Sequence, residues 1–167
     1  MLVLGIDPGT AITGYGLVEA QGNKLKVVDY SCIRTPANSP LEYRLQTIHG
    51  AVVDLIREYK PAQLAIEELF FNKNVRTALS VGHARGVIML AGVNAGLEVF
   101  EYTPLQVKQA VVGYGRAEKA QIQFMVKTLL CLPETPKPDD VADALAIAIC
   151  HTHFYNSRKM LDARGNK

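Results

Sequence analysis

The sequence predicts an α/β domain in which helices flank a five-stranded mixed sheet, with three antiparallel strands first and parallel strands after them. Two observations predict this class. Short turns separate the first three alternating segments, which is typical of antiparallel strands, whereas helical segments separate the later ones. A strand–helix–strand crossover joins parallel strands by a right-handed path. At 167 residues, of which 49% are hydrophobic, the chain is long enough for one domain with a substantial core.

The first half of the predicted sheet is a meander. Residues 2–7 form a short apolar strand that ends at Pro8-Gly9, where the chain must turn. Residues 13–19 alternate as a second strand, Gln21-Gly22-Asn23 is typical of a hairpin turn, and residues 25–34 form the third strand. We therefore expect these three strands to pair antiparallel in sequence order.

Helices and strands alternate in the second half. Apolar residues recur at helical spacing over residues 41–59, and Pro61 ends that helix. Residues 64–66 are a buried strand that leads into Glu67. A helix rich in small residues then runs over residues 74–94, with Asn74 as its cap.

The last part of the chain adds one strand and three helices. Residues 97–102 are the fifth strand, and Thr103-Pro104 begins a short helix as N-cap and first helical residue. A second helix carries apolar residues on one face over 122–129, and the last helix begins near Asp139. Strands one, four and five should therefore run parallel.

Composition limits where the protein works. We place the domain at residues 1–155 and expect the basic, polar segment 156–167 to be a flexible tail. The net charge is only +2, so nucleic acid would have to be bound by local basic patches.

No apolar run reaches membrane-spanning length, and we expect no signal peptide and no membrane partner. The three cysteines fit neither a disulfide framework nor a zinc site, which favours the cytoplasm.

Four acidic residues point to a metal site. Asp7 and Glu67 stand at the carboxyl ends of predicted strands, where ligands collect in parallel sheets, and they meet if those strands are neighbours. Asp140 and Asp143 share one face of the last helix near its N-terminus. Carboxylates without His or Cys suit Mg²⁺, with Mn²⁺ as a substitute, and two such ions about 4 Å apart can promote phosphodiester hydrolysis.

Asp7 and the first two aspartates of the last helix each have a structural alternative. Asp7 can hydrogen-bond within its own turn, and Asp139 and Asp140 can cap the last helix, but neither explains Asp143. Spacing alone does not decide whether Asp139 or Asp140 accompanies Asp143. Because Asp139 opens the helix, we expect Asp139 to cap it and Asp140 to face the site.

Six short motifs between residues 5 and 150 carry a family resemblance. They are Gly5-Ile6-Asp7-Pro8-Gly9, Ala65-Ile66-Glu67, Ala84-Arg85-Gly86, Gln106-Val107-Lys108-Gln109, Ala117-Glu118-Lys119 and Ala142-Asp143-Ala144-Leu145-Ala146. With these motifs the chain resembles the RuvC family of bacterial Holliday-junction resolvases, which are ribonuclease-H-like nucleases.

The resemblance implies a ribonuclease-H-like fold and a crossover junction endodeoxyribonuclease. Such an enzyme is a homodimer that makes paired, symmetric nicks in four-way DNA junctions during homologous recombination and DNA repair. A branch-migration helicase complex, RuvA and RuvB, is its implied partner. Asp7, Glu67, Asp140 and Asp143 fall on the family's metal-binding acids, and Lys108 is similar to a lysine near the scissile phosphate. The extra acid Asp139 departs from the family pattern.

Several basic residues are placed where they can contact DNA. Lys73, Arg76 and Arg85 lie in a stretch without acids. Arg116 and Lys119 flank the start of a helix, where cations oppose the helix dipole and a phosphate would be attracted. The alternative for each is a solvated surface cation.

Phe70 and Phe71 come shortly after the strand that leads into Glu67, and only one can easily face inward. The resemblance favours Phe70 stacking on an unpaired base at the junction centre, and the alternative is that both are core.

Two symmetric nicks need two active sites related by a dyad, so we expect a homodimer. The helix with Gly82 and Gly86 is our candidate for its interface.

Three other functions share some of these features. The segment from Gly5 to Thr10 also resembles the phosphate loop of the actin, sugar-kinase and heat-shock ATPases, but those proteins need two such domains. A junction-binding protein without catalysis predicts that the acids are dispensable. A ribonuclease H that cuts RNA in hybrids shares the acids and differs in substrate.

Overall fold

One mixed sheet with the strand order β3-β2-β1-β4-β5 forms the centre of the computed structural model. The strands are β1 (Leu2–Asp7), β2 (Ile12–Gln21), β3 (Lys24–Arg34), β4 (Gln63–Glu67) and β5 (Glu98–Tyr102). β1, β2 and β3 pair antiparallel, and β1, β4 and β5 pair parallel, which confirms the predicted sheet. The structure describes the backbone of residues 1–22, 24–69 and 75–165, and the side chains of 1–22, 24–69 and 78–155.

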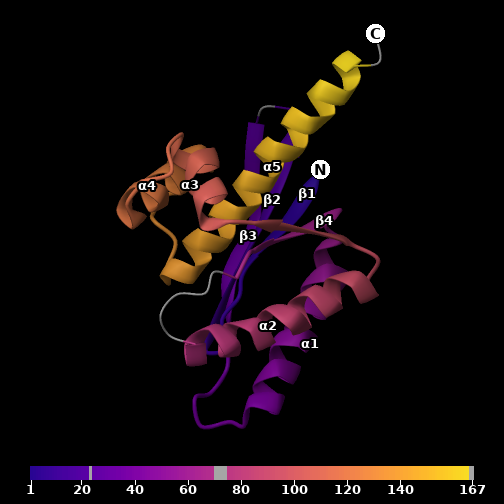
Figure 1. Cartoon of the computed structure of the whole chain (residues 1–167), viewed down its shortest axis with the longest axis vertical. Coiled ribbons are helices and arrows are strands. Elements are labelled where there is room, and N and C mark those ends of the chain that lie inside the picture. The colour runs from indigo at the N-terminus through magenta and orange to yellow at the C-terminus, as the bar shows by residue number, and fades with distance from the viewer. Residues whose placement is uncertain (23, 70–74, 166–167) are drawn as a thin grey trace.

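Helices cover both faces of the sheet (Figure 1). One face carries α1 (Leu41–Tyr59) and α2 (Val75–Asn94), and α5 (Asp139–Gly165) crosses the other face. α3 (Pro104–Val112) and α4 (Lys119–Leu129) pack beside α5. α5 continues past Tyr155 to Gly165, so the described part of the basic segment extends this helix, while its expected flexibility stays a prediction. None of the helices in the described ranges has the length and hydropathy needed to cross a membrane.

The two faces of the sheet bury separate halves of the core. Ile6 of β1 and Ile66 of β4 pack with α1 and α2, whereas Val3 and Ala65 belong to the core under α5. Strand side chains alternate between the two faces, so odd-numbered positions of β1 and β4 face α5.

This alternation puts the two strand-end acids on the same face. Ile6 and Ile66 are direct partners in the parallel pairing of β1 with β4. Each is followed by an acid, Asp7 or Glu67, that must point toward α5. The neighbouring strands therefore deliver both predicted acids to one edge of the sheet.

α5 approaches β1 and β2 closely because glycines face it. A Cβ at Gly14 would overlap the carbonyl oxygen of Asp140, and one at Gly5 would overlap the carbonyl oxygen of Ala144 and lie 2.8 Å from Cβ of Ala148. Glycine inside a strand often marks such a close approach of another backbone. The start of α5 is thereby held against the strand that carries Asp7.

Candidate active site

The turn after Asp7 is fixed by hydrogen bonds from three directions. Thr13 Oγ1 donates to the carbonyl oxygen of Gly9 at 2.6 Å, and the hydroxyls of Thr10 and Ser80 on α2 are hydrogen-bonded at 2.8 Å. The backbone N–H of Thr35 donates to the carbonyl of Ala11 at 3.1 Å. Within the described residues the Asp7 carboxylate makes no hydrogen bond to this turn, so the structural alternative for Asp7 is not supported.

The four predicted acids form one electrostatic cluster. Burial, and then repulsion by Glu67, Asp143 and Asp140, raises the pKa of Asp7 to about 8. Burial, and then the charge of Asp143, raises the pKa of Glu67 to about 7. Burial also raises the pKa of Asp143 against the opposing charge and hydrogen bond of Lys119, and the charges of Asp139 and Asp140 add to the rise. Carboxylates that repel one another in a partly buried place favour a bound cation.

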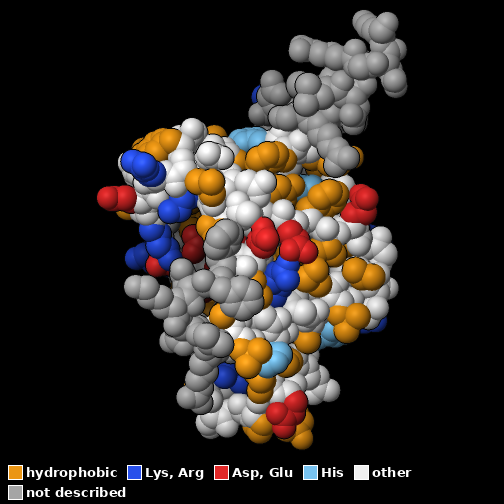
Figure 2. All heavy atoms as spheres, viewed as in Figure 1, with side chains coloured by type: hydrophobic (Ala, Val, Ile, Leu, Met, Phe, Trp, Pro, Cys, Tyr) orange, Lys and Arg blue, Asp and Glu red, His pale blue; other side chains and the backbone are white. Residues whose placement is uncertain are grey.

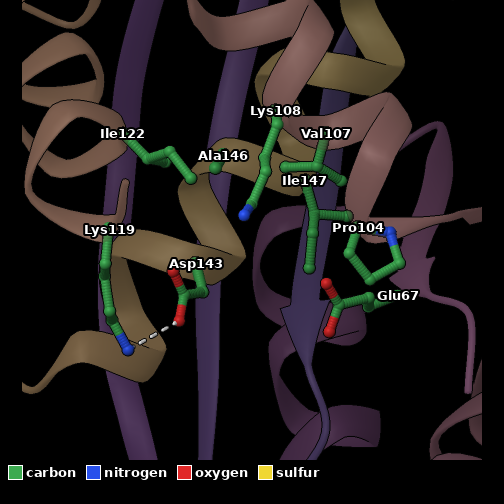
Figure 3. Close-up of a pocket in the computed structure, with 9 residues that line it drawn as sticks. All are labelled: Glu67, Pro104, Val107, Lys108, Lys119, Ile122, Asp143, Ala146 and Ile147. Carbon is green, nitrogen blue, oxygen red and sulfur yellow. Dashed lines mark ion pairs between the residues drawn. The ribbon is translucent and has the colours of Figure 1, made fainter. Parts of the chain in front are cut away.

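Two lysines stand beside these acids. Lys119 Nζ lies 3.1 Å from Oδ2 of Asp139 and 3.3 Å from Oδ2 of Asp143. Burial alone would lower the pKa of Lys119, but the hydrogen bond to Asp139 and the charge of Asp143 outweigh it and raise that pKa. Lys108 reaches from α3 toward the space between Asp143 and Glu67 (Figure 3), and its charge opposes the rise in the pKa of Glu67.

These groups line a cavity of about 230 Å³ between α3, α4, α5 and the end of β4. Glu67 and Asp143 supply its acids, and Lys108 and Lys119 supply its cations. The volume is below the range of roughly 300–1,000 Å³ that is usual for small-molecule sites. The cavity therefore suits one phosphodiester group of a larger molecule better than an enclosed small ligand.

Asp139 and Asp140 play different parts. The expectation that Asp139 caps α5 is corrected, because its Oδ1 accepts a hydrogen bond from Gln123 Nε2 at 2.9 Å and its Oδ2 pairs with Lys119. The hydrogen bond from Lys119, followed by that from Gln123, lowers the pKa of Asp139. Asp140, and not Asp139, is among the charges that raise the pKa of Asp7. Asp140 is therefore the member of the pair that acts on the strand-end acid.

The donor set fits a hard divalent cation by its chemistry, since it consists of carboxylate oxygens. As the side chains stand, no three His, Cys, Asp or Glu residues in the described ranges are close enough to hold one ion together. Lys119 pairs with Asp143 in this arrangement. The acids would have to move closer together to bind a cation, and Asp143 would then pair with the metal ion in place of Lys119.

Arg85, a predicted DNA contact, is held within the protein. Its Nε donates to the carbonyl oxygen of Glu67 at 3.2 Å, and its guanidinium forms an ion pair with Glu101 of β5. In this arrangement Arg85 braces the end of the strand that carries Glu67. Sequence patterns missed Glu101 because nothing in its own strand indicates a partner on α2.

The other predicted contacts lie partly outside the described residues. Arg116 is exposed between α3 and α4, and Lys119 is half exposed. Lysine and arginine side chains gather over α3 and α4 on the face shown in Figure 2. Arg76 lies in α2, but its side chain is outside the described set, and Phe70 and Lys73 are outside the described residues altogether.

The glycines that admit α5 were also missed as part of the site. Gly14 and Gly16 interrupt an otherwise typical strand pattern, and a Cβ at Gly16 would lie 2.5 Å from the Leu145 side chain. Glycine within a strand was the available signal.

Carboxylates at the ends of two neighbouring parallel strands, facing two more on a helix across the sheet, define a metal-dependent nuclease of the ribonuclease-H-like fold. The sequence profile described as "Crossover junction endodeoxyribonuclease RuvC" matches residues 3–151. The chain belongs to the RuvC family, as the sequence motifs predicted.

Individual relatives agree with this assignment. The crossover junction endodeoxyribonuclease RuvC of Desulforamulus reducens is 65% identical over 154 residues, which are 92% of this chain and 94% of that protein. The structure of Thermus thermophilus RuvC has a TM-score of 0.86 at 38% identity and covers 94% of this chain and 96% of that one. T. thermophilus RuvC in complex with Holliday junction substrate has a TM-score of 0.88 at 37% identity, covering 93% and 94%.

Proposed function

We propose that this protein resolves four-way DNA junctions by paired, symmetric, metal-dependent hydrolysis of phosphodiester bonds in homologous recombination and DNA repair. The observation that carries the proposal is the four-acid cluster at the sheet edge, in a chain that the RuvC profile matches over residues 3–151. The likeness to a RuvC bound to Holliday junction substrate supports the choice of DNA. The likeness to that RuvC structure covers 93% of this chain, which favours a nuclease over the ATPase alternative.

The metal ligands in this proposal are Asp7, Glu67, Asp140 and Asp143. Their oxygens suit Mg²⁺, with Mn²⁺ as a substitute and two ions in each site. Such ions activate water and stabilise the leaving oxygen of a phosphodiester. Burial, and after it the repulsion between the acids, raises the pKa values of Asp7 and Glu67, and this supports the assignment because a bound cation would stabilise the charged forms of both.

The two lysines position DNA in this proposal. Lys108 presents its ammonium to the cavity beside Glu67, where it can hold the scissile phosphate against the acids. Lys119 is half exposed and can exchange its pairing with Asp143 for a backbone phosphate when a metal ion binds that acid.

The remaining DNA contacts stay predictions. Lys73, Arg76 and Arg116 are proposed to contact phosphates, and Phe70 to stack on an unpaired base. Arg85 would reach DNA only by leaving Glu101, so the bracing of Glu67 is its better supported part.

The homodimer is proposed from a face of α2. Leu79, Leu90 and Val93 are 61%, 53% and 61% exposed and lie along one stripe of this helix, with exposed Gly86 between them. Gly82 faces its own chain, because a Cβ there would lie 3.4 Å from Cδ1 of Leu69. A second copy of the chain fits this stripe, because a two-fold contact also supplies the two sites that paired nicks require.

Partners and location complete the proposal. A branch-migration helicase complex would deliver the junction, and the protein would work in the cytoplasm. Both come from the family resemblance and the cysteine pattern, and a pull-down with the helicase subunits would test the first.

The test uses a labelled four-way junction, a matching duplex and an RNA–DNA hybrid, each with Mg²⁺ and with chelator. We expect nicks at symmetric positions in the junction alone, and only with Mg²⁺. Cutting of the hybrid would favour a ribonuclease H. Metal-independent binding without nicks would favour a binding protein, and ATP hydrolysis without nicking would favour the ATPase fold class.

A further inference from the structure

A chain of hydrogen bonds, buried except at Glu98, links α5 to the sheet and ends at Tyr102 beside the candidate active site. Tyr102 Oη and His151 Nδ1 are 2.8 Å apart, and His151 Nε2 and Gln63 Oε1 are 2.7 Å apart. Gln63 Nε2 in turn donates to Oε2 of Glu98 at 3.2 Å. The chain joins α5 to β4 and β5 on the face of the sheet that carries the acids.

The direction of each hydrogen bond follows from Gln63. Its amide nitrogen is committed to Glu98, so its Oε1 must accept, and His151 must carry its proton on Nε2. Because burial keeps the ring neutral, Nδ1 carries no proton and accepts a hydrogen bond from the Tyr102 hydroxyl. Each polar group has a single role, and His151 is neutral in this arrangement.

The ring of His151 is also held by packing. Its centroid lies 4.6 Å from that of Phe100, 5.8 Å from that of Tyr102 and 5.8 Å from that of Tyr155. The side chain is fully buried, and burial lowers its pKa to about 4 despite the opposing charge of Glu98. A buried, neutral and fully hydrogen-bonded histidine is a rigid link between α5 and the sheet.

Tyr102 occupies a decisive position beside the acids. It is the direct strand partner of Glu67, and its carbonyl oxygen accepts the backbone N–H of Glu68 at 2.8 Å. The next residue, Thr103, caps α3 through a capping box with Gln106, and Pro104 lines the cavity. Whatever fixes Tyr102 therefore also fixes the start of the helix that presents Lys108.

We propose that Tyr102 and His151 are positioning residues for cleavage. Their hydrogen bond clamps the end of β5 against α5, and so sets Glu67 of β4 opposite Asp143 and aims Lys108 into the space between them. Asp143 lies eight residues before His151, or about 12 Å along the helix, so one rigid helix carries both. The inference rests on the proposed nuclease function.

The test compares two tyrosines that each donate one hydrogen bond. Tyr102→Phe removes the hydroxyl that binds His151, and Tyr59→Phe removes a hydroxyl that donates to Asp29 at 3.0 Å, outside the site. Single-turnover cleavage of a labelled junction at saturating enzyme would be measured with the junction Kd and the Tm. We expect Tyr102→Phe to lower the cleavage rate about tenfold or more with unchanged Kd, because small misplacements of catalytic groups are costly.

Tyr59→Phe should keep the cleavage rate within about twofold of the parent, although it too loses a hydroxyl that donates a hydrogen bond to a carboxylate or ring acceptor. Gln63→Met breaks the other hydrogen bond of His151 and should lower cleavage in the same direction, which covers poor folding of Tyr102→Phe. An ¹H–¹⁵N spectrum of the His151 ring should show the neutral Nε2–H form in the parent.

Parental cleavage rates in both Tyr102→Phe and Gln63→Met would overturn the proposal. So would equal losses in Tyr102→Phe and Tyr59→Phe, since these would reflect stability alone, or an Nδ1–H form of His151. Failure of the proposed function looks different, because the unaltered protein would then not cleave the junction, and this inference would fall with it.

Discussion

Nζ of Lys119 on α4 lies 3.3 Å from the Asp143 carboxylate on α5, so a lysine neutralises one of the acids proposed to bind metal. A metal ion and this lysine cannot both be the main partner of Asp143. Loading the site with metal should therefore release a cation next to the bound DNA. The lysine then links the metal content of the site to its affinity for phosphate.

Lys119→Met tests this link. Lys119 and Asp143 are both partly exposed. Loss of their ion pair should therefore lower the free energy of unfolding in chelator by less than about 1 kcal/mol. Junction affinity with Mg²⁺ should fall, and the slope of log K against log salt should decrease by about one. Gel shifts at several salt concentrations measure this, with Lys127→Met at the other end of α4 as the control. An unchanged salt slope would place Lys119 away from DNA.

Asp7→Asn should separate binding from cutting. Cleavage should be lost, while junction affinity stays or rises because a negative charge is removed. Burial raises the pKa of Asp7 from its ordinary value of 3.8 to about 8 in the folded protein, so this group costs stability progressively as pH rises from about 4 to about 8. In chelator at pH 8 the variant should therefore melt at a higher temperature than the parent. A lower Tm, or affinity lost along with activity, would contradict the assignment.

The neighbouring aspartates should behave differently. Asp140→Asn should lose most metal-dependent cleavage, because Asp140 acts on Asp7. Asp139→Asn should remain active with a small decrease in Tm, since it loses part of its contact with Gln123 and Lys119. Cleavage assays with a range of Mn²⁺ concentrations would separate weak metal binding from a dead site. An inactive Asp139→Asn with a normal Asp140→Asn would reverse the assignment.

His151 should make the fold sensitive to acid. Burial lowers its pKa from the ordinary value of 6.5 to about 4 in the folded protein, so the unfolded chain takes up a proton first as the pH falls. Stability contributed by neutral His151 is complete above about pH 6.5 and is lost toward pH 4, by about 3 kcal/mol in all. Urea unfolding of the parent and His151→Gln at each pH isolates this effect, because other groups, including Asp7 with its opposite slope, cancel in the difference. A difference that does not shrink below pH 6.5 would contradict the burial of His151.

The α2 stripe predicts the oligomeric state. Leu90→Lys should convert the dimer to a monomer and abolish paired nicking, because a charge would enter an apolar contact. Phe124→Lys, at a residue of α4 that is 64% exposed, is the control and should remain dimeric. Light scattering at the concentration of the cleavage assay gives the mass. A parent protein that is monomeric and fully active would refute the dimer.

Much of this fold could be predicted from periodicity and turn residues. Apolar spacing gave α1 over the same residues, 41–59, that the structure shows, and Thr103 with Pro104 marked the start of α3 correctly. The acids were found because they follow apolar strands or open a helix. Their meeting required β1 and β4 to be neighbours, which the crossover allowed but did not require.

What could not be predicted depends on contacts between distant elements. The pairing of Arg85 with Glu101 and of Asp139 with Gln123 joins residues 16 positions apart in the chain, and no local pattern specifies either. The position of Asp139 at the start of α5 favoured a cap, but its carboxylate pairs with Lys119 of α4 instead. The hydrogen bond between Tyr102 and His151 spans 49 positions and was equally hidden.

The glycines of β1 and β2 have a consequence for transplanting this chemistry. The distance between the acids of the sheet and those of α5 depends on Gly5 and Gly14. Because these residues have no Cβ, the helix can lie directly against the sheet. Copying the four carboxylates into another α/β scaffold would leave them a methyl group or more too far apart. A mutational scan would score Gly14→Ala as a loss of catalysis, although the residue carries no chemistry, since one added carbon would push half of the site away as a unit.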